Sequence, residues 1–244
     1  MRILVLSDIH ANLPALEAVL KDAGTFDHIW CIGDVVGYGP HPNECIALLN
    51  SYDHLCVAGN HDWAVLGKLD LHDFNLDARK ATLWTQKKLS EPAREYLEKL
   101  QVRLQHDEFT IVHGSPREPI WEYILLTSTA TTSFSWFQTP YCFIGHTHSP
   151  AIFQEVTNDV SVSTRCLNIQ FDEPVTLGDE RLIINPGSVG QPRDGDARAS
   201  YIMLDLEKRT FVYHRTVYPV SSTQAHMRDC HLPDRLITRL AHGW

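Results

Sequence analysis

Short hydrophobic runs alternate with longer segments of helical periodicity through the first 150 residues of the chain. Apolar runs of strand length occupy residues 3–7, 28–32, 55–58, 109–112 and 141–144. Helical spacing follows at residues 13–20, at 43–49 and across 62–100, and Asn12 and Pro14 mark the start of the first helix. Strands that alternate with helices in this way predict βαβ units and a parallel sheet.

The pattern changes after residue 150. Residues 151–156, 182–184, 200–204 and 210–217 are strand-like pieces, and one or two helices are expected near the C-terminal end. These pieces predict an additional antiparallel layer. The chain has 244 residues, 43% of them hydrophobic, and no internal repeat divides it. We therefore expect a single domain over residues 1–244.

Side chains that commonly bind metals follow five successive predicted strands. They are Asp8 and His10 after the first strand, Asp34 after the second, Asn60 after the third, His113 after the fourth, and His146 and His148 after the fifth. Open α/β sheets bind their ligands at the carboxyl ends of the strands. The seven side chains are therefore expected to converge, whereas unrelated surface histidines would not follow strand after strand.

This donor set contains oxygens and imidazole nitrogens but no thiolate. It is too large for one transition metal with an open position, yet sufficient for two ions if one carboxylate bridges them. Asp34 is the expected bridge, because it comes from a central strand and lies on a glycine-flanked turn. Mixed nitrogen and oxygen ligation favours manganese first, with iron, zinc, cobalt or nickel as alternatives. Gly33, Gly59 and Gly145 precede ligands, where a residue without a β-carbon lets the backbone pass close to the ions.

Composition narrows the partners and the location. Twenty-one basic residues against thirty acidic ones give a net charge of −9, so we expect no nucleic-acid binding by overall charge. An acidic chain that acts on phosphate needs a local source of positive charge. The six cysteines show no paired spacing and indicate small buried hydrophobes in a reducing compartment. Neither a signal-peptide core nor an apolar stretch of membrane length is visible, so the expected location is the cytoplasm, away from membranes.

Five short motifs stand in a fixed order along the chain. They are Asp8-x-His10, Gly33-Asp34-x-x-Gly37, Gly59-Asn60-His61-Asp62, His113 and Gly145-His146-x-His148. In this order they resemble the signature of the calcineurin-like metallophosphoesterase superfamily. Further along, residues 185–193 resemble the closing segment of its small bacterial and archaeal phosphodiesterases. Each motif alone is a weak signal, but five in the right order are a strong one.

The resemblance implies an α/β fold, a four-layer α/β/β/α sandwich with two mixed sheets flanked by helices, and a site for two divalent transition-metal ions. The ligand sets carried over by motif are Asp8, His10, Asp34 and His148 for one ion, and Asp34, Asn60, His113 and His146 for the other. A hydroxide that bridges the ions would attack phosphorus in line. His61 matches the catalytic histidine, which gives a proton to the leaving oxygen or contacts the phosphate, and Asn60 and Arg193 are further candidates for substrate contact.

The function expected on this basis is a phosphodiesterase acting on a small or nucleotide-like phosphate ester. Protein phosphatases of the superfamily continue the second motif with an Asp-Arg pair, and this chain has Gly37-Tyr38 instead. Some related phosphodiesterases have cysteine where this chain keeps His61, so cleavage of monoesters stays open. The alternatives are a phosphomonoesterase or protein phosphatase, a dinucleoside polyphosphate hydrolase, and a metal-binding scaffold without turnover.

Several neighbouring residues have simpler structural interpretations. Asp62 after a turn is expected to be a helix N-cap, and Asn185-Pro186-Gly187-Ser188 is typical of a type II turn. Arg193 fits a phosphate contact or an exposed salt bridge equally well, and Tyr38 and His41 are weaker candidates for the pocket. The helical segment 64–100 and the hydroxyl-rich stretch 127–139 are expected to shape that pocket.

Overall fold

The structure is a computed structural model that describes residues 1–157 and 162–244. Its strands form two six-stranded sheets. The first sheet has the order β3 (His54–Cys56), β2 (His28–Cys31), β1 (Arg2–Leu6), β11 (Ala199–Asp205), β12 (Thr210–Thr216), β9 (Pro174–Thr176). The second has the order β4 (Arg103–His106), β5 (Phe109–Val112), β6 (Tyr141–Phe143), β10 (Leu182–Asn185), β7 (Ala151–Thr157), β8 (Val162–Cys166).

Both sheets are mixed, as expected. In the first, β1, β2 and β3 are parallel and β11 joins β1 in the antiparallel sense. In the second, β5, β6 and β10 are parallel and β7 is antiparallel to β10. Helices connect the parallel strands β1 to β2 and β2 to β3, because a parallel pair needs a crossover that a tight turn cannot supply. In the first sheet, the parallel strands thus come from the first half of the chain and the antiparallel strands from the second.

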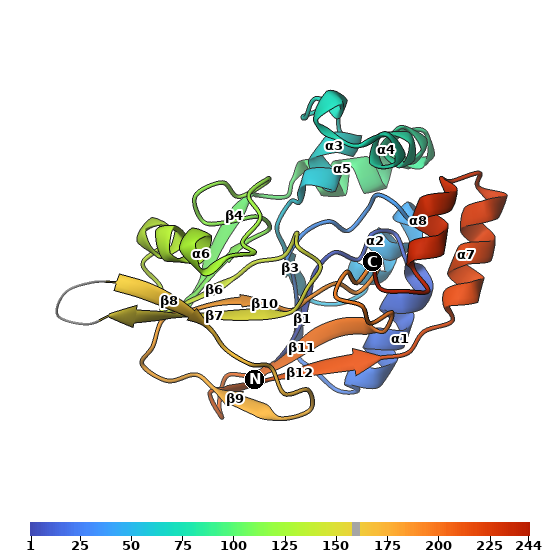
Figure 1. Ribbon diagram of the computed structural model, residues 1–244. Helices are drawn as coiled ribbons and strands as arrows, with labels where there is room; N and C mark the ends of the chain where they lie inside the picture. Colours follow the sequence, from blue (N-terminus) through green and yellow to red (C-terminus); the bar gives the residue numbers. More distant parts are fainter. Residues whose placement is uncertain (158–161) are drawn as a thin grey trace.

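Eight α-helices lie within the described residues: α1 (Leu13–Ala23), α2 (Pro42–Leu49), α3 (Asn60–Val65), α4 (Leu76–Lys88), α5 (Glu91–Glu98), α6 (Thr127–Ser133), α7 (Val220–Asp229) and α8 (Asp234–Arg239). Two 3₁₀ turns, η1 (Leu71–Asp73) and η2 (Phe134–Trp136), accompany them. Helices α1, α2 and α5 cover the outer face of the first sheet, and α6 covers that of the second (Figure 1). This arrangement is the expected α/β sandwich of four layers.

The alternation of side chains along β1 shows how the layers hold together. Ile3 and Val5 point into the core between the two sheets, whereas Leu4 and Leu6 point to the helices on the other side. Successive side chains of a strand face opposite ways, so a strand buried on both faces must be apolar throughout. The continuous run at the N-terminus is therefore the sequence of a central strand.

Four elements were not predicted from the sequence: β4, β8, β9 and α6. Strands β8 and β9 are mostly exposed edge strands, so their sequences lack a clear apolar alternation. Helix α6 has the sequence TSTATTS, which carries little helical periodicity, and it is held by packing of Ala130 on the second sheet. The expectation of six buried cysteines is wrong for Cys166, which is exposed on β8, and for Cys230, which is only half-buried.

None of the helices in the described ranges is long and apolar enough to cross a membrane.

Candidate metal centre

The residues that follow the carboxyl ends of β1, β2 and β3 in the first sheet meet those that follow β5 and β6 in the second. The loops after these five strands bring all seven expected side chains into one buried cluster: Asp8, His10, Asp34, Asn60, His113, His146 and His148. Each has at most 3% of its surface exposed. Both sheets contribute, so the cluster forms only when the two sheets pack together.

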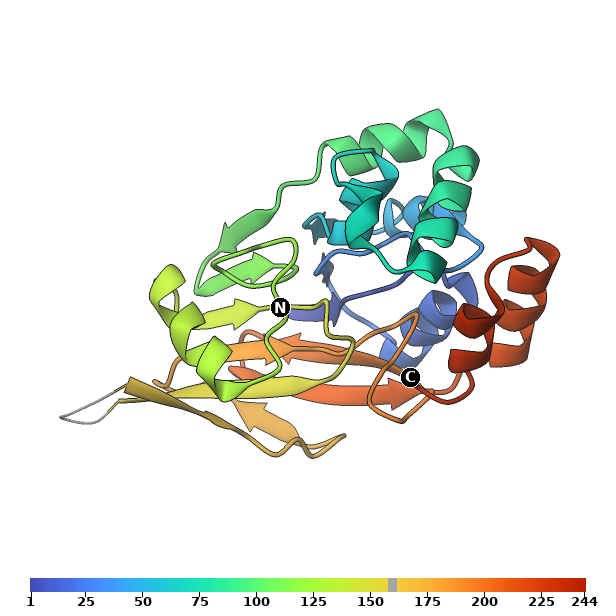
Figure 2. The ribbon, with the colours of Figure 1, turned by 45° about the horizontal axis from the view of Figure 1, so that its top comes forward.

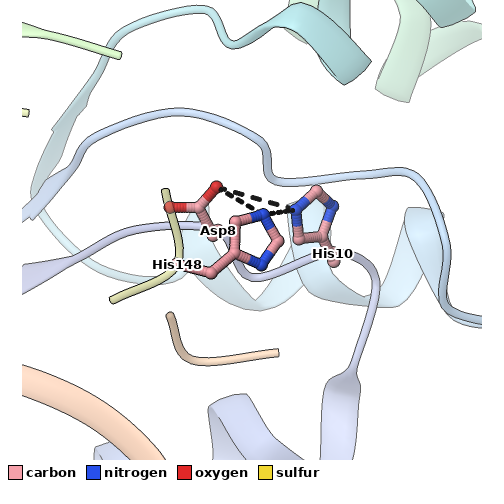
Figure 3. Close-up of side chains that lie close together, drawn as sticks. All are labelled: Asp8, His10 and His148. Atoms are coloured by element: carbon pink, nitrogen blue, oxygen red, sulfur yellow. Dashed lines mark hydrogen bonds and ion pairs between the residues drawn. The ribbon is translucent and has the colours of Figure 1, made fainter. Parts of the chain in front are cut away.

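One half of the cluster consists of Asp8, His10 and His148 (Figure 3). The Oδ1 atom of Asp8 lies 3.2 Å from Nε2 of His148 and 3.6 Å from Nε2 of His10. The two Nε2 atoms are 3.1 Å apart. Three ligand atoms from loops 138 residues apart in sequence therefore face a common point.

The other half consists of Asp34, His113 and His146, with Asn60 beside them. Oδ2 of Asp34 lies 3.3 Å from Nε2 of His113 and 3.6 Å from Nε2 of His10, which belongs to the first half. Oδ1 of Asn60 is 3.3 Å from the same His113 nitrogen. Asp34 thus stands between the two halves, in the place expected of a bridging carboxylate.

Four imidazoles of the cluster each have one ring nitrogen on a backbone carbonyl. Nδ1 of His10 lies 3.1 Å from the Val36 oxygen, and Nδ1 of His113 lies 2.7 Å from the Ile32 oxygen. Nδ1 of His148 lies 2.6 Å from the Gln191 oxygen. In His146 the contact is made by Nε2, which lies 3.1 Å from the Trp121 oxygen. A ring nitrogen that donates to a carbonyl carries the proton, so the other nitrogen of a neutral ring keeps its lone pair. Such carbonyl contacts are typical of imidazoles that bind a metal.

Both carboxylates have one fixed oxygen and one oxygen without a partner. Asp8 Oδ2 accepts from the Ser7 hydroxyl and the His146 amide, and Asp34 Oδ1 accepts from the His61 amide. Asp8 Oδ1 and Asp34 Oδ2 form no hydrogen bond within the described residues. A buried, unpaired carboxylate oxygen is costly, and a cation between it and the imidazole lone pairs removes that cost. The residues therefore fit two divalent cations.

The backbone at this cluster is strained. Asp8, His10, Asp34, His146 and His148 all have positive φ, between 49° and 65°. Left-handed conformations of residues other than glycine cost on the order of 1–3 kcal/mol each and gather at functional sites. Gly59 shows how crowded the loops are, because a Cβ there would lie 2.0 Å from Oδ1 of Asp34. The absence of a side chain at Gly59 thus lets the backbone pass close to the Asp34 carboxylate.

A family model described as the calcineurin-like phosphoesterase superfamily domain matches residues 1–209. The chain belongs to this superfamily. The crystal structure of a metallophosphoesterase from Sphaerobacter thermophilus is 47% identical with a TM-score of 0.89, covering 100% of this chain and 99% of that one. An uncharacterized protein of Methanocaldococcus jannaschii is 37% identical over 248 residues, 99% of this chain and 98% of its own length. The symmetrical bis(5'-nucleosyl)-tetraphosphatase of Ectopseudomonas mendocina is 30% identical over 133 residues, 50% of this chain and 47% of that protein.

Charge and burial oppose each other in this metallophosphoesterase site. Burial disfavours the charged form of Asp34, but the neighbouring His113 and His61 hold its pKa below the ordinary range. Burial likewise works against a charged His113, yet Asp34 raises the pKa of that imidazole to about 10. Burial lowers the pKa of both His61 and His146 to about 3, which keeps these rings neutral. Only a neutral imidazole has a lone pair for a metal.

His61 faces a small cavity of about 80 Å³ that opens onto the cluster, which we call the metal cavity. Its Nδ1 has no hydrogen-bond partner within the described residues. The ring centroid lies 4.2 Å from that of Tyr38 and 5.3 Å from that of Phe74. Gly37 makes room for the ring, because a Cβ at position 37 would lie 2.6 Å from Nδ1 of His61. The imidazole is thus fixed with a free nitrogen beside the cluster.

The closing segment of the superfamily acts here as a support for the ligand loops. Asn185 donates to the Gly145 carbonyl and the Thr147 hydroxyl, and the Ser188 hydroxyl donates to the Asp8 carbonyl. Gly187 has φ of 81°, but residues 186–188 form neither a turn nor a bend, so the expected type II turn is not confirmed. The hydrogen bonds nevertheless give the segment a structural role.

Asp62 has a structural role at the start of helix α3. It occupies the third helical position, however, and not the N-cap position that was expected, which is Gly59. Its carboxylate oxygens accept from the amides of Gly59, the N-cap, and Val36, at 3.0 and 3.1 Å. This is the acidic residue of a capping box. The contact ties α3, which carries Asn60 and His61, to the loop that follows Asp34.

Of the remaining candidates for the pocket, Arg193 and Tyr38 line the metal cavity and His41 does not. Arg193 lines the metal cavity and forms no salt bridge within the described residues, and its Nη2 is 2.9 Å from Gln191 Oε1 and 3.4 Å from the Tyr38 hydroxyl. Tyr38 lines the same cavity. His41 turns away from the cluster and contacts His226 of α7, with ring nitrogens 3.0 Å apart.

Sequence reasoning missed three aromatic residues of the cavity wall: Phe74, Trp121 and Tyr123. Tyr123 stacks on the His146 ring at 3.9 Å. Two of the three lie in the loop before α6, in no motif, and only their aromatic character would have pointed to them. The stretch 64–100 does contribute to the wall, through residues 73–75 and 78. The stretch 127–139 instead packs Ala130, Phe134 and Phe137 on the outer face of the second sheet, so that expectation is wrong for these residues.

Proposed function

We propose that the protein is a dinuclear metal-dependent phosphodiesterase that cleaves a small or nucleotide-like phosphate ester. The observation that carries the proposal is the unpartnered Oδ2 atom of Asp34, which stands between the imidazoles of His10 and His113. A cation on each side of this oxygen would take the place of the proton that His113 shares with it and would be bound by the nitrogens of both imidazoles.

The two ions would be held by separate ligand sets that share Asp34. One set is Asp8, His10, Asp34 and His148, and the other is Asp34, Asn60, His113 and His146. Manganese is the proposed metal, because the donors mix imidazole nitrogen with carboxylate and amide oxygen. Two such ions would supply an acidified water as the nucleophile and would offset charge on the phosphorus oxygens.

The chain's own polar groups then act on the ester. His61 would donate a hydrogen from a ring nitrogen to the leaving oxygen or to a phosphoryl oxygen, because its ring lines the metal cavity. The Asn60 amide lies beside it on the first turn of α3. Arg193 would bind a phosphoryl oxygen through its guanidinium, which lines the same cavity.

The shape of the site favours a diester over a phosphoprotein. A diester needs room for a group on each side of phosphorus, and the metal cavity of about 80 Å³ adjoins a second cavity of about 670 Å³. Tyr38 stands where protein phosphatases of the superfamily have an arginine in the second motif. A scaffold role without turnover is disfavoured, because every position of the ligand set is filled in this chain.

Hydrolysis of a dinucleoside polyphosphate is a second candidate. It is favoured by the 30% identity, over half of this chain, to the symmetrical bis(5'-nucleosyl)-tetraphosphatase. In this reaction, too, a phosphoryl group would lie at the metal centre, so the roles of the named residues would be unchanged.

A direct test compares two chromogenic esters, bis(4-nitrophenyl) phosphate and 4-nitrophenyl phosphate. The protein is stripped of metal, reloaded with manganese and assayed beside the Asp34→Ala variant. The proposal predicts manganese-dependent release of nitrophenol from the diester, faster than from the monoester, and none above background in the variant. Equal diester rates in the two proteins, or no turnover with both metals bound, would refute it.

A further inference from the structure

A second cavity of about 670 Å³ lies next to the metal cavity. The two share part of their walls, through Tyr38, Asn75, Tyr123 and Arg193. A molecule bound at the metal centre can therefore extend past these four side chains without crossing the protein interior. Cavities of about 300–1,000 Å³ are typical of small-molecule sites.

The second cavity carries a concentration of positive charge. Arg193, Arg235 and Arg239 line it, and Asp77 is the one acidic residue of its lining. In the part of the chain that the structure describes, none of these arginines forms an ion pair with a carboxylate. We call this space the arginine cavity. The protein as a whole has a net charge of −9, so the cavity is the local positive field that an acidic phosphohydrolase requires.

Helix α8 places two of the arginines. Leu236, Ile237 and Leu240 pack with Ala78 and Ala81 of α4 in one buried cluster. Positions 235 and 239 are four residues apart, so their side chains emerge on the same face of the helix. Packing of α8 on α4 (Figure 2) thus directs that face to the cavity beside Asn75, at the start of α4.

Arg193 links the two cavities. Its amide donates to the His148 carbonyl, and its Nη2 lies 3.4 Å from the Tyr38 hydroxyl. Its Nε is buried without a hydrogen-bond partner in the described residues. The guanidinium therefore stands at the boundary, able to contact a phosphate at the metal centre or the next group along.

The surroundings of Arg239 disfavour its charged form. Burial lowers the pKa of Arg239 to about 10, and the neighbouring Arg193 and Arg235 add to that effect. Three like charges held near a single carboxylate, that of Asp77, store an unfavourable interaction, which a bound anion would reverse. Guanidinium groups bind phosphate oxygens in pairs of hydrogen bonds, so phosphate fits these donors better than a single carboxylate does.

We infer that the arginine cavity binds a second phosphoryl group of the substrate, so that the substrate is an ester or anhydride with at least one phosphoryl group beyond the one that is cleaved. This inference rests on the proposed function, which places the scissile phosphorus at the metal centre. Arg235 and Arg239 lie beyond residue 209, where the superfamily match ends. The C-terminal helices would thus add a specificity site to the common metal centre.

The test measures inhibition of diester hydrolysis by inorganic phosphate and by inorganic tripolyphosphate. Wild type is compared with the double variant Arg235→Gln/Arg239→Gln, and Arg94→Gln on α5 is the matched control. Free manganese is buffered in excess, and chelation acts on all three proteins alike. Wild type should bind tripolyphosphate more tightly than phosphate, and this preference should fall roughly 10- to 100-fold in the double variant but not in the control.

An unchanged preference in the double variant, with diester turnover intact in wild type, overturns the inference and leaves the proposed function standing. If wild type cleaves no ester, the proposed function fails. Calorimetric titration of tripolyphosphate into manganese-free protein then decides whether the arginine cavity binds an anion. Weaker binding by the double variant than by wild type then supports an anion site, and equal binding overturns it. Thermal melting of each variant checks that the fold is intact.

The source of the second phosphoryl group is tested with diadenosine tetraphosphate and adenosine triphosphate. If the double variant is slower on diadenosine tetraphosphate, the site is assigned to the phosphate chain of a dinucleoside. If it is slower on adenosine triphosphate, the site is assigned to the phosphate chain of a mononucleotide. Equal rates in both proteins on both compounds, with turnover present, overturn the inference.

Discussion

Asp34 is the residue on which both halves of the cluster depend. One carboxylate oxygen is held by the His61 amide at 2.8 Å, and the other stands 3.3 Å from His113 and 3.6 Å from His10. Asparagine at this position keeps the shape of the side chain but removes its charge. It also replaces one carboxylate oxygen with an NH2 group, which is a hydrogen-bond donor. The proposed ions would then share no ligand.

We predict that Asp34→Asn loses both bound ions. Manganese per chain after gel filtration should fall from two to near zero, as measured by atomic emission. The control is Asp53→Asn, an exposed carboxylate whose one ion-pair partner within the described residues is His28. Retention of two ions by Asp34→Asn would show that the carboxylate is not the bridge.

The His61 ring lines the metal cavity but belongs to neither of the proposed ligand sets. We predict that His61→Asn keeps its manganese and cleaves the diester more slowly by roughly 10²–10⁴-fold, the usual worth of a positioned proton donor. The rate constant and the metal content are measured on the same preparation. Loss of metal in this variant would make His61 a ligand, and an unchanged rate would remove it from the reaction.

At this scale the sequence was informative about which side chains cluster in the site and poor about the residues that surround them. Asp8, His10 and Asp34 could be predicted, because a polar residue at the end of an apolar strand has few structural reasons to be there. Trp121 and Tyr123 could not be predicted, since they lie in an irregular loop and reach the cavity only through the tertiary fold. The positive φ angles of the ligands are also set by the packed loops.

At the scale of elements, the short helix α3 positions the chemistry. It carries Asn60 and His61 on its first turn, and Asp62 ties that turn to the loop after β2 through two amide contacts. A six-residue helix has little stability of its own, so this contact and the packing around it must hold the turn in place.

We predict that Asp62→Asn destabilises the protein by about 1–3 kcal/mol, because the amide accepts from only one of the two buried backbone donors. Urea unfolding of the metal-free protein gives the free energy. Diester turnover should fall too, since Asn60 and His61 lose their fixed positions. Asp70→Asn, which changes an exposed cap of η1, is the control and should have a smaller effect on both. Equal effects of the two substitutions would contradict this role.

Central strands and edge strands differed in how well they could be predicted. The core strands β1, β2, β5 and β6 are apolar because both of their faces are buried, and the expected boundaries are accurate to one or two residues. The edge strands β8 and β9 owe their conformation to pairing with β7 and β12. Their own sequences contain little that distinguishes a strand from a loop.

At the scale of the molecule, the metal centre joins the two sheets. Asp8, His10 and Asp34 come from the first sheet, whereas His113 and His148 come from the second. Without cations, the buried carboxylates repel one another, and burial together with Asp34 raises the pKa of Asp62 to about 7. Bound metal should therefore stabilise the packing of sheet on sheet.

We predict that chelation lowers the melting temperature of the wild type. A ligand at 100 times its dissociation constant stabilises the folded state by about 2.7 kcal/mol, enough to move the transition by several degrees. Calorimetric scans in excess chelator and in manganese measure the shift. Asp34→Asn should melt at the same temperature in both buffers, and an unchanged wild-type transition would contradict the prediction.

The most direct measurement is a titration of metal-free protein with manganese, in which bound metal and hydrolysis of bis(4-nitrophenyl) phosphate are followed together. The account predicts no turnover without metal and a rate that rises to a plateau at two ions per chain. Full turnover in the stripped protein, or a plateau reached with one ion, would contradict a centre built around a shared Asp34.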